Sequence, residues 1–259
     1  MEEINELVNV MKTLRSENGC SWDKKQTHES LVPYVLEEAY EVVDALEKKD
    51  FQNLKEELGD LLFQIVFHSE LASEVGRFTL EDVVRDVKEK LIRRHPHVFG
   101  EQKNLSPEEV ESNWEKLKSK EKLRQSGILD SIPKSLPALQ RAEKLQDKAK
   151  TIGFDWDSID GPISKFQEEW KELEEARLNL ESKERLEEEL GDVFFSLVNI
   201  SRFLKISPET AIRKTCNKFS ERFSRMEMIS TETGIKLDTL SLKELDALWD
   251  KAKKIEKGF

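Results

Sequence analysis

The sequence predicts an all-α protein built from two tandem copies of one helical domain. Three observations lead to this prediction: apolar residues recur at helical spacing, glycine and proline are scarce, and four blocks of sequence occur twice. The chain has 259 residues, of which only 10 are glycine and 7 are proline, while 37% are charged. This composition is typical of long, solvent-exposed helices and not of a turn-rich β protein.

Helical periodicity is present from the N-terminus onward. The apolar residues of the stretch Ile4–Leu14 follow the i, i+3, i+4 spacing of one buried helix face. Ser106 and Ser207 each precede a proline, a pattern that places a capping residue before the first helical position. No stretch alternates apolar and polar residues for long enough to predict a sheet, and we expect about ten helices.

The repeated blocks occur in the same order in both halves of the chain. Their copies are offset by similar distances, from 128 residues (Lys90 to Lys218) to 135 residues (Trp114 to Trp249). Since only loops need differ in length, the chain is interpreted as a duplicated domain. The paired blocks are VLEEAYEVVDAL with FQEEWKELEEAR, LKEELGDLLFQIVFHSELA with LEEELGDVFFSLVNISRFL, VKEKLIRRHPHVF with TCNKFSERFSRM, and SNWEKLKSKEK with ALWDKAKKIEK.

The predicted boundary lies in the stretch GILDSIPKSLPALQ, where Gly127, Pro133 and Pro137 interrupt helical sequence. We expect a first domain at residues 1–125, a linker at 126–140 and a second domain at 141–259. A helix expected at about residues 136–151 either connects the two domains or begins the second.

Each repeat pairs two acidic helix faces. Glu38 and Glu41 are three residues apart and share one face of a helix, and Glu57 and Asp60 repeat that spacing on the next. The short connection between these helices predicts an antiparallel hairpin, which brings the four carboxylates together. The second repeat has the same arrangement of Glu169, Glu172, Glu189 and Asp192.

Four gathered carboxylates repel one another, by about 4 kcal/mol for each pair at 4 Å and an effective dielectric constant of about 20. They persist by taking up protons or by binding cations. Ligands that are all oxygen favour Mg²⁺ or Mn²⁺ over zinc, so both sets are predicted metal sites. An isolated ExxE motif is more often a solvated helix face. Here the whole pattern recurs and leads directly into apolar sequence, which favours the metal site. A di-iron bundle would need Glu-x-x-His pairs, and none of the four histidines forms one.

Basic and aromatic residues follow the acidic motifs in both repeats. Arginine and lysine bind phosphate oxygens, and tryptophan stacks on nucleobases. Taken singly, the basic residues are better explained as surface ion-pair partners, and the tryptophans are equally well explained as core anchors. Together with the carboxylates they predict a site for a polyphosphate that carries a base. The predicted nucleotide-binding residues are Lys90, Arg93, Arg94, Trp114 and Lys118 in the first repeat and Lys218, Arg222, Trp249 and Lys253 in the second.

Composition and missing motifs exclude several other classes. The net charge of −11 provides no long-range basic field for nucleic acid, and no glycine pair has the spacing of a phosphate-binding P-loop. No apolar run approaches the roughly 20 residues that span a bilayer, and the N-terminus lacks the features of a signal peptide, so we expect a cytoplasmic protein. Cys20 and Cys216 form no CxxC motif and are interpreted as reduced, packed or idle thiols.

The EExxE…ExxD pattern on paired helices resembles the all-α nucleoside triphosphate pyrophosphohydrolases. The tandem arrangement, with CSWDKKQTHESL before the first motif and RRHPHVFG after it, is similar to the MazG family. The family usually has proline where this chain has Ser21, which affects the rigidity of that turn and not the chemistry. The resemblance implies Mg²⁺-dependent hydrolysis of NTPs and dNTPs, over a broad range of bases, to monophosphate and pyrophosphate by a homodimer.

The resemblance also implies roles for individual residues. Glu37 and Glu168 begin each motif and would orient or deprotonate the attacking water. Arg94, Lys218 and Arg222 would stabilise charge on the phosphoryl oxygens. The eight carboxylates named above would hold the metal. Two alternatives remain open: a helical interaction protein without catalysis, and a carboxylate-metal phosphohydrolase of other specificity, such as an inorganic pyrophosphatase.

Overall fold

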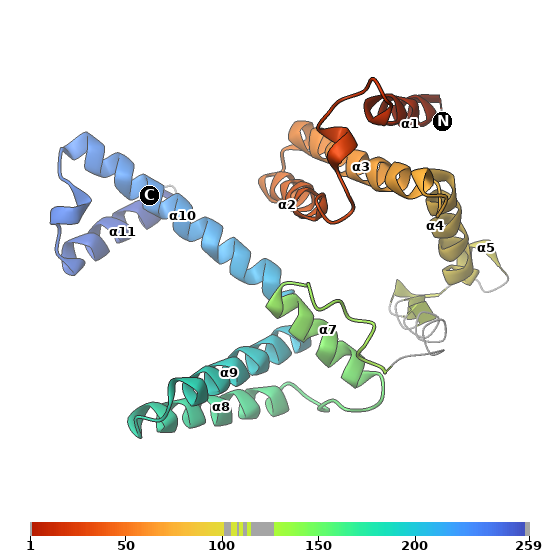
Figure 1. Ribbon diagram of the computed structural model, residues 1–259. Coiled ribbons are helices and arrows are strands. Elements are labelled where there is room, and N and C mark those ends of the chain that lie inside the picture. Colours follow the sequence, from red (N-terminus) through yellow and green to blue (C-terminus); the bar gives the residue numbers. More distant parts are fainter. Residues whose placement is uncertain (1, 101–104, 108, 111–112, 115–126, 257–259) are drawn as a thin grey trace. The chain divides into compact units, whose positions relative to one another are not determined.

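The computed structural model describes residues 2–100, 105–107, 109–110, 113–114 and 127–256, and every regular element within these ranges is helical (Figure 1). The predicted all-α class is therefore confirmed. The chain divides into two compact units, Met1–Glu121 and Lys122–Phe259. None of the described helices combines the length and apolar character needed to cross a membrane. Cys20 and Cys216 are both exposed and unpaired.

The first unit is centred on a hairpin of two long helices. Its elements are α1 (Glu2–Arg15), the 3₁₀ turn η1 (Asp23–Lys25), α2 (Val32–Lys48), α3 (Phe51–Glu74), α4 (Leu80–Arg94) and the short α5 (Pro96–Phe99). A small core forms where α1 and the start of α2 meet the second half of α3. Its buried members are Met11, Leu31, Val66, Phe67 and Leu71.

Local sequence explains why α2 and α3 form a tight hairpin. Lys49 adopts a left-handed conformation (φ 57°) that ends α2. Asp50 then caps α3 by accepting a hydrogen bond of 3.0 Å from the backbone N–H of Asn53. Only two residues separate the helices, which places the acidic positions of α2 opposite those of α3.

The second unit repeats this hairpin and adds a second one. It contains α7 (Ala138–Lys150), α8 (Asp160–Leu178), α9 (Lys183–Phe203), α10 (Pro208–Thr233), η2 (Leu237–Thr239) and α11 (Leu242–Glu256). Ser182 caps α9 by accepting a hydrogen bond of 3.2 Å from the N–H of Arg185, just as Asp50 caps α3. The helix expected at 136–151 is α7, and it packs against α9 and α10. The boundaries 1–125, 126–140 and 141–259 stay a prediction.

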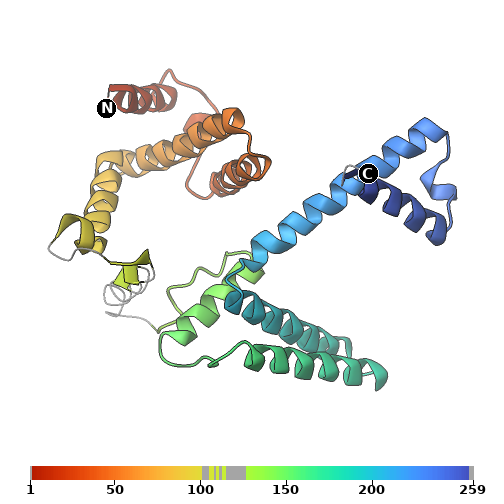
Figure 2. The ribbon, with the colours of Figure 1, turned by 180° about the vertical axis from the view of Figure 1, so that it is seen from behind.

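The two hairpins of the second unit diverge. α8 packs along α9, whereas α11 folds back on α10. Figure 2 shows α10 running away from the α8/α9 hairpin, with α11 beside its far half. A left-handed glycine, Gly234 (φ 70°), ends α10 and allows the chain to reverse.

Long-range ion pairs fix the segments around the hairpins. In the first unit Arg15 donates two hydrogen bonds of 2.6 and 2.7 Å to Glu74, joining α1 to α3. In the second, Arg202 at the end of α9 binds Asp155, in the segment before α8, with one contact of 2.9 Å. The side chains of Arg202 and Asp155 are only 8% and 13% exposed, so loss of either partner leaves the other charge nearly buried.

We therefore expect Arg202→Met to destabilise the second unit by about 3 kcal/mol, since breaking a buried pair leaves an uncompensated charge. A matched control is Lys171→Met, which removes an ion pair with Glu175 whose side chains are 76% and 58% exposed. This control should change stability by about 0.5 kcal/mol or less. Urea unfolding followed by circular dichroism measures both values. Equal effects of the two variants would contradict the structural role of the Arg202–Asp155 pair.

Candidate metal and nucleotide site

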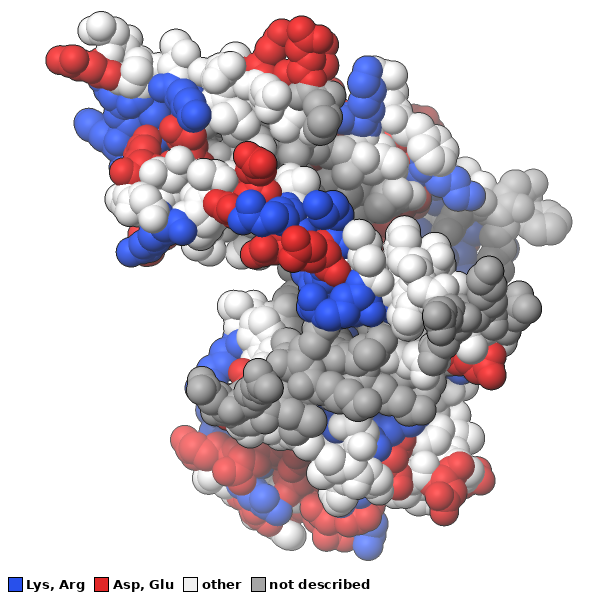
Figure 3. Space-filling view, turned by 90° about the vertical axis from the view of Figure 1, so that its right-hand side faces the viewer, with Lys and Arg blue, Asp and Glu red and all other residues white. Residues whose placement is uncertain are grey.

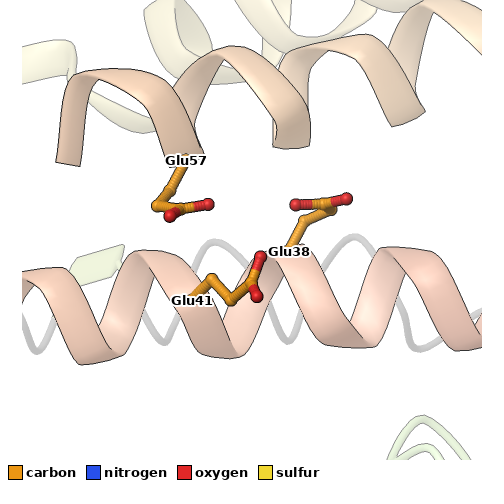
Figure 4. Close-up of side chains that lie close together, drawn as sticks. All are labelled: Glu38, Glu41 and Glu57. Carbon is orange, nitrogen blue, oxygen red and sulfur yellow. The ribbon is translucent and has the colours of Figure 1, made fainter. Parts of the chain in front are cut away.

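The first acidic cluster lies between α2 and α3. One carboxylate oxygen from each of Glu38, Glu41 and Glu57 lies within 4.8 Å of the others. Figure 4 shows Glu57 extending from one helix of the hairpin toward Glu38 and Glu41 on the other. Glu38 and Glu57 are half-buried and Glu41 is exposed. The ExxE spacing and the two-residue connection are thus sufficient to gather three carboxylates.

The second cluster occupies the same place between α8 and α9. Oxygens of Glu169, Glu189 and Asp192 lie within 4.8 Å of one another. This cluster is more deeply buried, because Glu169 is 6% exposed and Glu189 only 1%. One oxygen of Glu189, Oε2, is buried without a hydrogen-bond partner in the described structure. A buried carboxylate oxygen of this kind is available for a cation.

Six of the eight predicted metal ligands therefore lie in two compact groups. The other two lie close by: the charge of Asp60 acts on Glu38, and the charge of Glu172 acts on Glu189. The donor set is oxygen only, which fits Mg²⁺ or Mn²⁺. The assignment of these residues as metal ligands stays a prediction.

Electrostatics show that the first cluster is under repulsion. Burial raises the pKa of Glu38, and the charges of Asp60 and Glu41 raise it further. Burial and the charge of Glu41 likewise raise the pKa of Glu57. Among the described residues, no lysine or arginine forms an ion pair with Glu38, Glu41 or Glu57. A bound cation would relieve this repulsion.

The second cluster contains its own cations. Lys165 Nζ lies 2.9 Å from Glu168 and 2.6 Å from Glu169, and these hydrogen bonds raise the pKa of the lysine. Arg185 forms an ion pair with Glu189 and a longer one, 3.4 Å, with Glu188. Burial still raises the pKa of Glu189, although Arg185 opposes the rise. In the first repeat the matching positions hold Tyr34 and Asn53, which carry no charge.

Sequence reasoning did not single out Lys165 or Arg185. The signal was present, since each lies four residues before its partner glutamate on the same helix face. In a chain with 37% charged residues such spacings are common, so spacing alone did not distinguish this pair.

The predicted cations and tryptophans contact one another in both units. The Arg94 guanidinium lies over the Trp114 ring at 5.4 Å, and Arg222 lies over Trp249 at 5.6 Å. His95 packs on the edge of Trp114, with ring centres 4.9 Å apart. Lys90, Arg93, Lys218 and Lys253 are exposed, and Lys118 lies outside the described residues.

The structure does not bring these basic and aromatic residues to the carboxylates within one unit. In the second unit the carboxylates lie on the α8/α9 hairpin, whereas Arg222 and Trp249 lie on the diverging α10/α11 hairpin (Figure 2). In the first unit Glu57 lies near the start of α3, whereas α4, which ends at Arg94, follows the other end of α3 and does not run back along it (Figure 1).

Comparison with known proteins identifies the domain that contains these clusters. Residues 26–99 and 162–226 both match the MazG nucleotide pyrophosphohydrolase domain. The chain belongs to the MazG family. The predicted family resemblance is confirmed. Each matched range contains one complete acidic motif and one of the arginines, Arg94 or Arg222, while the two tryptophans lie outside the matched ranges.

Two relatives of known name align with nearly the whole of this chain. A Thermotoga maritima protein named nucleoside triphosphate pyrophosphohydrolase/pyrophosphatase MazG is 49% identical over 249 residues, covering 96% of this chain and 94% of that protein. A protein of Escherichia coli strain K12 named nucleoside triphosphate pyrophosphohydrolase is 42% identical over 260 residues, covering 99% of both chains.

The raised pKa of Glu38 predicts an opposite effect of Glu38→Gln with and without metal. Without metal the variant removes repulsion, so we expect its melting temperature in EDTA to rise by about 2–4 °C. With metal it lacks a ligand, so Mg²⁺ should stabilise it less than the wild type. Glu56→Gln, at an exposed neighbouring position, is the matched control and should show neither effect. Thermal unfolding in EDTA and in Mg²⁺ tests both expectations. A variant that melts lower in EDTA would contradict repulsion within the cluster.

Proposed function

We propose that this MazG protein hydrolyses nucleoside triphosphates to the monophosphate and pyrophosphate with Mg²⁺ as cofactor, and that Mn²⁺ can replace it. NTPs and dNTPs are both proposed substrates, over a broad range of bases. The observation that carries the proposal is the pair of oxygen-only carboxylate clusters, one in each MazG domain, each gathered within 4.8 Å. The names of the Thermotoga and Escherichia relatives support the reaction.

The proposed mechanism assigns metal binding to the hairpins. Glu38, Glu41, Glu57 and Asp60 would hold the ion in the first unit, and Glu169, Glu172, Glu189 and Asp192 in the second. When bound, Mg²⁺ neutralises the triphosphate and lowers the pKa of bound water. The carboxylates of the two helices would hold the ion, and the bound ion would supply positive charge to the triphosphate.

Other residues would act on the water and on the phosphates. Glu37 and Glu168 are exposed beside the clusters, and we assign them to orienting or deprotonating the attacking water. Arg94, Lys218 and Arg222 would stabilise charge on the phosphoryl oxygens. The remaining basic residues, Lys90, Arg93, Lys118 and Lys253, would bind phosphates, and Trp114 and Trp249 would stack on the base. Attack at the α-phosphorus is proposed.

A homodimer is the proposed functional state. Leu58, Leu62 and Ile65 form an exposed i, i+4, i+7 stripe on α3, between 37% and 50% exposed. The same stripe recurs at the matching positions of α9: Leu190, Phe194 and Leu197 are between 41% and 52% exposed. Exposed apolar surface of this kind indicates an interface. A second copy packed on these stripes would also supply the basic and aromatic residues that each hairpin lacks.

The charge distribution opposes nucleic acid as a partner. Acidic and basic side chains are interspersed over the face drawn in Figure 3, where the described residues form no extended basic patch. The net charge of −11 would repel a polyanion at long range. We propose a cytoplasmic enzyme, with nucleotides as its substrates and no membrane partner.

Inorganic pyrophosphatase activity is the second candidate, because the name of the Thermotoga relative includes the word pyrophosphatase. Incubation with each NTP, each dNTP and pyrophosphate, with Mg²⁺ or EDTA, distinguishes the candidates by the products. We expect monophosphate and pyrophosphate, only with metal. Diphosphate and phosphate would contradict the proposed reaction. Hydrolysis of pyrophosphate to phosphate, without hydrolysis of any NTP or dNTP, would favour the second candidate. No turnover would favour a non-catalytic interaction protein.

The double variant Glu57→Gln with Glu189→Gln removes one predicted ligand from each cluster. We expect it to lower the rate of pyrophosphate release roughly 100-fold or more, because even residues that only orient metal ligands contribute up to about 100-fold. The control pair is Glu56→Gln with Glu187→Gln, at exposed neighbouring positions, which should retain activity. Pyrophosphate release measured with a coupled assay tests this expectation. Equal rates for the two double variants would exclude the metal role of the clusters.

A further inference from the structure

A pair of histidines joins α3 to the segment that leads into α2. His28 lies in this segment, residues 26–31, and His68 lies on α3. Their Nδ1 atoms are 2.8 Å apart, their ring planes differ by 5° and their ring centres are 5.1 Å apart. The two nitrogens are closer to each other than the two ring centres are, by about as much as two rings can account for when each nitrogen points at the other ring. Both nitrogens therefore lie near the line that joins the ring centres. The rings therefore meet edge to edge, in nearly one plane.

This geometry fits one shared proton. A distance of 2.8 Å between two ring nitrogens is that of an N–H···N hydrogen bond, in which one Nδ1 donates and the other accepts. A zinc ion is too large for the gap, because two Zn–N bonds of about 2.0–2.1 Å at a tetrahedral angle hold the nitrogens about 3.3 Å apart. The bond persists when the pair is neutral or carries one added proton. When both rings are charged, two N–H groups face each other and the bond is lost.

The segment that contains His28 is a compact turn. Thr27 and Ser30 exchange hydrogen bonds, with the Thr27 N–H donating to Ser30 Oγ at 2.9 Å and the Ser30 N–H donating to Thr27 Oγ1 at 3.2 Å. Leu31 follows, 1% exposed, and packs in the core with Phe67. Within the described residues, the side-chain hydrogen bond between this turn and α3 is the one from His28 to His68. Movement of the turn would therefore move the start of α2.

We propose that the His28–His68 pair is a pH-sensitive latch, which holds the segment 26–31 and the start of α2 against α3 near neutral pH and releases them in mild acid. Glu38 and Glu41 lie about two turns and two and a half turns after the start of α2, so release would loosen the α2 side of the first carboxylate cluster. The histidine pair does not require the proposed hydrolysis to be correct, because the contact between His28 and His68 depends only on the fold of the first unit.

The charges around the pair support a switch between the two histidines themselves. Burial lowers the pKa of His68, and the charge of His28 lowers it further. Neighbouring charges compensate one another: Arg15 binds Glu74 and Arg85 binds Asp82. The charged residues on the elements around the pair include Lys12 and Arg15 on α1, Asp23 on η1, Glu29 beside His28, Glu37 and Glu38 on α2, Glu70 and Glu74 on α3, Arg77 after it, and Glu81, Asp82 and Arg85 on α4.

The pH dependence has a definite sign. Because the pKa of His68 is lowered in the folded protein, the unfolded or opened chain binds more protons below the ordinary histidine pKa of about 6.5. The latch is therefore fully closed above that pH and weakens as the pH falls through the lowered pKa. The second repeat has Ile200 at the position that matches His68, so the α8/α9 hairpin lacks this dependence and is an internal control.

Hydrogen exchange of the full chain tests the latch. After correction for intrinsic rates, we expect peptides that cover residues 26–36 to exchange roughly threefold or more faster at about pH 5.5 than at about pH 7.5. Peptides from α8 should show no such change. In His28→Gln, which cannot become charged, the difference should disappear, whereas His97→Gln, the control, should behave as the wild type. Equal pH dependence in the wild type and in His28→Gln would overturn the proposal.

Histidine NMR gives a second test that needs no stable variant at the latch. In the wild-type protein the His68 ring should titrate below the ordinary histidine pKa of about 6.5. If His28→Gln is folded, its His68 titration should move toward the ordinary value. A His68 ring that titrates at the ordinary histidine value in the wild type would overturn the proposal.

Discussion

Repulsion between carboxylates across a helix hairpin is the constraint on which the rest of this structure depends. Glu38 and Glu41 on α2 oppose Glu57 on α3, and Glu169 on α8 opposes Glu189 and Asp192 on α9. Such groups separate unless the backbone holds them together. The short connections with caps at Asp50 and Ser182, and the apolar contacts between the helices, supply that restraint. In each hairpin, the helix caps and the apolar contacts thus stabilise the fold enough to maintain a charge cluster between the two helices.

The two repeats meet this constraint in different ways. In the second, Lys165 and Arg185 lie against Glu169 and Glu189 and offset part of their charge. In the first, Tyr34 and Asn53 occupy the matching positions and offer no charge. The first cluster therefore depends more on protons or on a bound cation, while the second is held in place before any ion binds. Duplication has preserved the carboxylates and changed the residues that surround them.

Local sequence pattern was sufficient for the helices, for the hairpins and for the placement of six carboxylates in two groups. These features depend on spacings of three or four residues and on short connections, which a single sequence displays. The direction of α10 does not depend on such spacings. The sequence therefore predicted Arg222 and Trp249 beside the carboxylates, whereas the structure places them on another hairpin. The contact between His28 and His68 spans 40 residues of chain and arises only once α3 packs against the segment before α2. Tertiary packing determines both the direction of α10 and the contact between His28 and His68.

Direct counting of bound metal tests whether the two hairpins bind a divalent cation through their carboxylates. Titration of the nucleotide-free chain with Mn²⁺, followed by electron paramagnetic resonance, measures the number of ions bound and the affinity of each. We expect saturable Mn²⁺ binding at both hairpins, competition by Mg²⁺, and loss of one class of sites in Glu57→Gln and of the other in Glu189→Gln. Absence of saturable binding, or binding unchanged in both variants, would contradict it.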